Sequence, residues 1–233
     1  MEKIIKIVGE NKEIEMSELT DLNLSLFDGA TLTLKLLKLD DSKDIKISAK
    51  VGQNSHLVVF FADFSKRDIL LKSDIHLIEE NASCEWHLAS LSSTTAIKHF
   101  DVSFYHDVGS TKALMDNYGV ARDKSKIVFS GVNHIKNGSK KSITNQVAKI
   151  IVFDKDSIGV ASPILRIDEN DVSASHSASV GQLNSDHMFY LMSRGLNKNE
   201  ARELITRGYL QPISEKFSIE NKSKIEIAIK EAL

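Results

Sequence analysis

The stretch Ser173–Ala201, SASHSASVGQLNSDHMFYLMSRGLNKNEA, marks the point where the chain changes from strand to helix. Asn184 can cap a helix, because its side chain can accept hydrogen bonds from the free backbone N–H groups of the first turn. Leu183 and Met188 have the spacing of a hydrophobic staple around this cap. Gly195 lies where a glycine commonly ends a helix. The stretch therefore predicts a polar, His-bearing segment followed by short, capped helices.

Two further helices are expected after this point. Asn197 can cap the first of them, and Glu200 lies at the capping-box position three residues later. We expect Gly208 to end that helix. Apolar residues then follow the spacing i, i+3, i+4, i+7 and i+8, which is one stripe of an amphipathic helix: Ile225, Ala228, Ile229, Ala232 and Leu233.

Upstream of this stretch the pattern is that of β-structure. Apolar and polar residues alternate in two segments, 32–36 and 45–51. Such alternation directs one set of side chains inward and the other outward. The segment Leu57–Ala62 is apolar throughout, which predicts a strand that is covered on both faces.

A weak repeat follows the predicted turns: a small or turn-forming residue precedes Ala or Ser, and a short strand begins soon after. The middle intervals are 27, 28 and 29 residues (55 to 82, 82 to 110 and 110 to 139). Such a period is typical of a solenoid, although a β-sandwich with frequent turns also fits. The pairs are Gly29-Ala30, Asn54-Ser55, Asn81-Ala82, Gly109-Ser110, Gly138-Ser139 and Asp156-Ser157.

Composition narrows the class of protein. The formal net charge of the 233 residues is −2, without the basic excess typical of nucleic-acid binding. The longest apolar run has about six residues, far fewer than the roughly twenty that span a bilayer. Cys84 is the only cysteine, and the N-terminus does not resemble a signal peptide. We therefore expect a cytoplasmic protein that binds neither nucleic acid nor membrane.

The C-terminal stretch resembles the signature of the SufB/SufD family of iron–sulfur cluster assembly proteins. A weaker likeness extends back through 163–167 and 126–131. Ser177 follows the signature His, where SufB-like chains carry an acidic residue, so the resemblance is closer to SufD. The matching residues are His176, Ser177-Ala178-Ser179-Val180-Gly181, Leu183, Phe189-Tyr190-Leu191, Ser193-Arg194-Gly195 and Ala201.

The resemblance implies a mainly β fold. The expected core is a right-handed parallel β-helix over residues 1–178, with a small C-terminal α-helical domain over 179–233. Family members usually carry an additional N-terminal helical region. None is visible here and the β region looks about a turn short, so the resemblance is to a short member.

The resemblance also implies a function. The chain would be a non-enzymatic scaffold subunit that binds a SufC-type ATPase through residues 183–233 and pairs with a SufB-like subunit or a second copy of itself. A transient iron–sulfur cluster would form at the subunit interface, with His176 as its metal and cluster ligand. The expected partner-binding residues are Phe189, Tyr190, Arg194, Gly195 and Ala201.

Adjacent helical residues diverge by about 100°, so we expect one of Phe189 and Tyr190 to be buried and the other to meet the partner. Cys84 and Trp86 share a strand face. Cys84 could be a ligand or a sulfur carrier, but a lone cysteine is more often a small buried hydrophobe. His99 and Asp101 also share a face, and His106 and Asp107 lie nearby. A solvated strand surface or a metal pair would explain this last group.

Two other functions stay open at this point. The chain could be a structural or regulatory homologue that keeps the fold and the ATPase contact without assembling clusters. It could also be a β-helical enzyme that acts on polysaccharides. Such enzymes need paired carboxylates, whereas the carboxylates here are scattered along the sequence.

Overall fold

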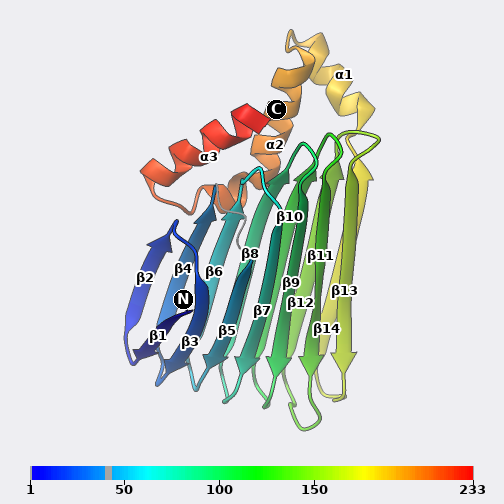
Figure 1. Cartoon of the computed structure of the whole chain (residues 1–233). Helices are drawn as coiled ribbons and strands as arrows, with labels where there is room; N and C mark the ends of the chain where they lie inside the picture. The colour runs from blue at the N-terminus through cyan, green and yellow to red at the C-terminus, as the bar shows by residue number, and fades with distance from the viewer. Residues whose placement is uncertain (1, 40–43, 233) are drawn as a thin grey trace.

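The computed structural model describes residues 2–39 and 44–232. Along the chain, successive strands alternate between two parallel sheets (Figure 1). The first sheet contains β1 (Glu2–Val8), β3 (Asp21–Phe27), β5 (Ile45–Val51), β7 (Ile69–Leu77), β9 (Ile97–His106), β11 (Lys126–Ile135) and β13 (Ile158–Ile167). The second contains β2 (Asn11–Met16), β4 (Thr31–Lys38), β6 (His56–Asp63), β8 (Ser83–Ser92), β10 (Lys112–Ala121), β12 (Ile143–Val152) and β14 (Ser173–Gln182).

Each strand of one sheet is followed by a strand of the other that runs in the opposite direction, so each pair forms one coil (Figure 1). The ladders within each sheet are parallel, for example that of β10 with β12. A β-sandwich would pair its strands antiparallel. The parallel β-helix expected from the resemblance is therefore confirmed, and the β-sandwich alternative is wrong.

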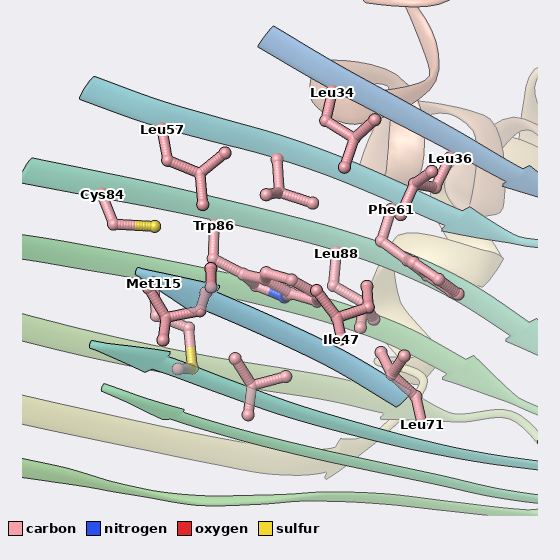
Figure 2. Packing of buried hydrophobic residues seen from close by; sticks show 14 of the residues in the cluster. Leu34, Leu36, Ile47, Leu57, Phe61, Leu71, Cys84, Trp86, Leu88 and Met115 are labelled. Atoms are coloured by element: carbon pink, nitrogen blue, oxygen red, sulfur yellow. The ribbon is translucent and has the colours of Figure 1, made fainter. Parts of the chain in front are cut away.

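The core lies between the two sheets and consists of side chains stacked in register from coil to coil. In the second sheet, one inward column runs through Leu34, Val59, Trp86 and Met115, all of which are buried. Figure 2 shows Trp86 and Met115 packed together, with Cys84 nearby. Full burial of such a side chain contributes roughly 1.5–3 kcal/mol. The inward residues of segment 45–51 are also buried, as their alternation predicted.

The predicted turn residues lie between strands of the first sheet and the following strands of the second. Asn54 and Asn81 have φ values of 55° and 61°, and Asn81 donates a side-chain hydrogen bond of 3.1 Å to Asn54 in the preceding turn. Gly29 and Gly138 also have positive φ. Asp156-Ser157 differs, because it lies in a turn at the other end of the strands, between β12 and β13.

Three helices follow the last strand: α1 (Ser185–Ser193), α2 (Lys198–Ser214) and α3 (Ile219–Ala232). The side chain of Asn184 caps α1, and Asn197 with Glu200 forms the predicted capping box of α2. The prediction that Gly208 ends α2 is wrong, since the helix continues to Ser214. Leu210 and Ile213 beyond the glycine are buried, and their packing outweighs the low helix propensity of glycine.

α2 and α3 lie against the end of the second sheet at which its strands finish (Figure 1). Leu210, Ile213, Ile225 and Ile229 bury their side chains in one cluster with residues at the ends of β4, β6, β8 and β10. Ala228 and Ala232 of the predicted stripe are partly buried there, and Leu233 lies outside the described residues.

The helices cover only one part of the apolar segment Leu57–Ala62, which was predicted to be covered on both faces. Leu57, Val59 and Phe61 face the core and are buried. The outward Val58 and Phe60 are only half-buried. Ala62 is buried beneath the helices, so the segment is covered on both faces only near its C-terminal end.

The expected boundary between residues 178 and 179 falls inside β14, which continues to Gln182. The helical region therefore follows the last strand directly. None of the helices in the described part of the chain is long and apolar enough to cross a membrane.

Candidate functional site: the uncovered end of the β-helix

The last coil, β13 and β14, has one open side. Within residues 2–39 and 44–232, no strand pairs with the outer edge of either strand. Val180 faces the interior, since its Cγ1 lies 2.9 Å from the ideal Cβ position of Gly159 across the coil. It is nevertheless 44% exposed. The interior of the β-helix is therefore open to solvent at this end.

His176 belongs to the inward column of this open coil. It lies four residues before Val180 on β14, and residues at even spacing share a strand face. Its register partner on β12 is Gln146, and Met115 and Trp86 follow beneath in the same column. His176 is exposed because no further coil covers it in the described part of the chain. Its imidazole is thus accessible from outside while its neighbours are core residues.

The core near the open end contains buried amide side chains. Gln146 is only 2% exposed, and its Oε1 has no hydrogen-bond partner among the described residues. The Oδ1 atoms of Asn117 and Asn133 are also buried without a partner within this part of the chain. Asn133 donates from Nδ2 to Thr144 Oγ1 at 2.8 Å. Gln146 thus lies between His176 and the apolar Met115 in one column, while the two asparagines belong to other columns of the core.

His176 supplies a single metal-ligating group. Among the described residues, no group of three or more His, Cys, Asp or Glu side chains could hold a metal ion. Cys84 lies on β8, three strands away from β14, the strand that carries His176. Neighbouring strands are about 4.8 Å apart, so Cys84 is too far away to bind the same metal ion. It is buried, and burial, with a smaller contribution from Glu85, raises the pKa of its thiol well above the usual value. Cys84 is therefore the buried core residue that the sequence predicted.

The candidate metal-binding residues on and after β9 do not share one surface. They are His99, Asp101, His106 and Asp107. His99 and Asp101 lie on the outer face, and a ring nitrogen of His99 lies 2.9 Å from Ser130 Oγ. His106 faces the core. Asp107 contacts His76 and Lys136 outside it. The structure does not bring these residues together, so the surface interpretation accounts for His99 and Asp101.

The short helix α1 is a second exposed feature. Phe189 is 75% exposed and Tyr190 is 56% exposed, so the expectation that one of them is buried is wrong. No residue of this helix is buried, because α1 extends away from the β-helix (Figure 1). The Arg194 guanidinium lies 5.3 Å from the centre of the Tyr190 ring. Aromatic side chains with an arginine are common in protein interfaces.

The two other residues that were expected to bind a partner, Gly195 and Ala201, have different environments. Gly195 has a φ of 99° and is exposed at the turn after α1, where it takes a backbone conformation that favours glycine. Ala201, at the start of α2, is fully buried. In this structure its side chain supports the helical packing and presents no surface to a partner.

Sequence reasoning missed a groove between α2 and α3. The groove has a volume of about 360 Å³, and Leu204, Gly208 and Glu226 are among the residues that line it. Leu204 is 50% exposed, although it belongs to a helix that is packed on the sheet. An apolar residue outside the buried stripe of α2 was the signal that could have revealed this groove.

Comparison with known proteins identifies the family. Residues 10–209 match the model described as SUF system FeS cluster assembly, SufBD core domain. The chain is 33% identical over 132 residues to the iron–sulfur cluster assembly protein SufD of Bacillus subtilis, covering 57% of this chain and 30% of that protein. It is 26% identical over 125 residues to a SufBD family protein of Staphylococcus saprophyticus, covering 54% and 27% respectively.

A SufBD family protein of Staphylococcus epidermidis is 22% identical over 154 residues, which cover 66% of this chain and 33% of the relative. The matched parts thus span about a third or less of these relatives. The family model, by contrast, covers most of this chain, including both strands of the open coil and α1. The chain therefore belongs to the SufBD family of the SUF iron–sulfur cluster assembly system, and it is SufD-like.

Proposed function

We propose that this chain is a scaffold subunit on which the SUF system assembles iron–sulfur clusters. The observation that carries the proposal is the position of His176, an accessible imidazole in the inward column of an open last coil. A neutral imidazole can bind iron. The family match supports the same role.

The cluster is cargo in this proposal, and the chain supplies only part of its binding site. His176 is a single ligand, and the described residues do not gather further ligands around it. The other ligands would come from a second subunit, either a SufB-like chain or another copy of this one. The open coil favours such pairing, since edge strands carry unpaired backbone groups and Val180 is an exposed core-facing residue.

The C-terminal helices would bind a SufC-type ATPase. Phe189, Tyr190 and Arg194 form an exposed aromatic and cationic surface on and after α1, and the α2–α3 groove adds a second surface. ATP hydrolysis would belong to that partner, and the chain itself would have no catalytic role. When two ATPase copies approach each other, α1–α3 would transmit the movement to the subunit interface and open it around His176.

A structural or regulatory role without cluster assembly is the second candidate. The observation that favours it is the absence, within the described ranges, of a complete metal-ligand group. It shares the ATPase contact with the first proposal, so iron binding separates the two.

The test is co-purification with the SufC-type ATPase of the same organism, followed by anaerobic iron and sulfide analysis of the complex. We expect His176→Ala to leave the complex intact and remove its iron. His99→Ala is the matched control on the outer face, and it should retain the iron. A stable wild-type complex that never holds iron would favour the structural or regulatory role. Failure of the wild-type chain to bind the ATPase would reject the docking proposal.

A further inference from the structure

Gln146 and His176 are direct neighbours in the parallel ladder between β12 and β14. Both belong to the inward column, with His176 at the open end and Gln146 one strand deeper. Neighbouring strands are about 4.8 Å apart. Two long side chains in register at this spacing are within reach of each other.

The side-chain oxygen of Gln146 needs a hydrogen-bond donor. It is buried, and no described residue donates to it. A buried polar atom without a partner costs roughly 1–3 kcal/mol. Its neighbour on the deeper side, Met115, has a thioether and offers no side-chain N–H group. His176, on the open side, carries a ring N–H in either neutral tautomer.

We propose that Gln146 is a positioning residue: the exposed ring of His176, which makes no hydrogen bond to the Gln146 oxygen in this structure, turns to donate a hydrogen bond from one ring nitrogen to that oxygen, so that the other nitrogen faces the open end. This inference rests on the proposed role of His176 in binding cargo iron. The hydrogen bond selects one tautomer of the imidazole and fixes the ring orientation. The lone pair of the second nitrogen is then directed to the place where a partner subunit would meet the coil.

The chemistry follows from how histidine binds metals. A ligating imidazole nearly always donates its second N–H to a carboxylate, a carbonyl or a water molecule. Loss of such a partner typically lowers metal affinity by about 10–100-fold. Gln146 provides this acceptor from the core, where solvent does not compete for it. A buried amide without a partner near the open end is thereby given a role.

The experiment uses the full chain and three variants. Gln146→Met keeps the length of the side chain and removes the acceptor, while Gln146→Glu keeps an acceptor. Asn145→Ala is the matched control, because Asn145 joins the same two strands on the outer face through a 2.7 Å hydrogen bond to Ser175. The first readout is the tautomer of His176 in metal-free protein, from ¹⁵N chemical shifts at a pH where the ring is neutral. The second is the affinity for ferrous iron, measured without oxygen.

We expect a single tautomer in the wild-type chain, in Gln146→Glu and in Asn145→Ala. Gln146→Met should give a mixture of tautomers and weaken iron binding by about 10–100-fold. Thermal unfolding confirms that each variant is folded. Gln146→Met should cost only about 1 kcal/mol, because His176 is exposed and water can replace the lost acceptor.

An unchanged tautomer in Gln146→Met would overturn the proposal, whatever the iron affinity. Equal iron affinity in the wild type and Gln146→Met would overturn the positioning role as well. If the tautomer responds to Gln146→Met but no form of the chain binds iron, the hydrogen bond stands and the proposed cargo role of His176 fails. The two proposals can therefore fail separately.

Discussion

Lys98 Nζ lies 2.7 Å from Asp63 Oδ2, and both side chains are completely buried. Lys98 also donates to the backbone oxygens of Ser65 and Leu91 at 2.7 and 2.8 Å. Asp63 accepts from Ser65 and Ser90. Burial lowers the pKa of Lys98, while the Asp63 carboxylate acts in the opposite direction. The pair connects β6 with β9 inside the β-helix.

Replacing one member of this pair should destabilise the fold strongly. Lys98→Met leaves the Asp63 carboxylate buried without its cation, and we expect the free energy of unfolding to fall by about 3–5 kcal/mol. The control is Lys66→Met, which removes an exposed ion pair with Glu231 and should change stability by less than about 1 kcal/mol. Urea denaturation measures both. Equal effects would show that burial of the pair contributes nothing.

Two glycine substitutions should act in opposite directions. Gly131 has a φ of 147°, and an added Cβ would lie 1.8 Å from the carbonyl oxygen of Val102. Gly131→Ala should therefore cost at least about 2 kcal/mol. Gly208 lies within α2, and apart from its chain neighbours and the backbone of its own helix no described atom lies within 4 Å of an added Cβ, so Gly208→Ala should stabilise by about 0.5–1 kcal/mol. Thermal unfolding compares the two, and a stabilising Gly131→Ala would contradict the clash with Val102.

The buried His106 should make stability depend on pH. Its pKa is lowered from 6.5 to about 4, chiefly by burial and slightly by His134, while Asp107 opposes the shift. Between these values the unfolded chain binds more protons, so stability falls as the pH drops from 6.5 towards 4. At about 1.4 kcal/mol per unit, the contribution of His106 is roughly 3 kcal/mol.

His106→Gln isolates this contribution from that of the carboxylates. Asp107 and Asp154 have lowered pKa values and also lose stabilising interactions in acid. The variant should lose less stability than the wild type between pH 6.5 and 4, as followed by chemical denaturation. Parallel pH profiles would refute the role of His106.

The open coil should control pairing with a second subunit. Val180→Asp places a charge at an exposed, core-facing position of β14, and it should abolish pairing while changing monomer stability little. Ile4→Asp is the control, because Ile4 is 74% exposed on β1 at the opposite end. Sedimentation of the chain alone and with a SufB-like subunit gives the answer. Pairing that survives Val180→Asp would place the interface elsewhere.

Sequence patterns predicted the structure well where the geometry depends on residues that are close together in the sequence. Asn184 and Asn197 cap their helices as expected, because a cap needs only backbone groups two or three residues away. Turn residues such as Asn54 and Asn81 were also predictable, since asparagine tolerates positive φ. The prediction that Gly208 ends α2 was wrong, because the packing of Leu210 and Ile213 depends on strands that are distant in the sequence.

In the candidate site, too, the sequence did not predict contacts between residues that are far apart in the chain. The resemblance identified His176, but the sequence did not show that its side chain lies in a core column beside Gln146, which requires the register of β12 and β14. The pair of Lys98 and Asp63 was also missed, since its members are far apart in sequence and each alone resembles a surface residue.

The contacts of the helices have a consequence for folding. Glu15 on β2 accepts hydrogen bonds from Ser218 and Asn221 at the start of α3. Arg202 on α2 contacts Asp154 after β12 at 2.8 Å. Coils of a solenoid normally interact only with their neighbours, so such proteins can unravel from either end. Here the helices connect the first coil with the sixth, so the intervening coils and the helices should melt as one cooperative unit.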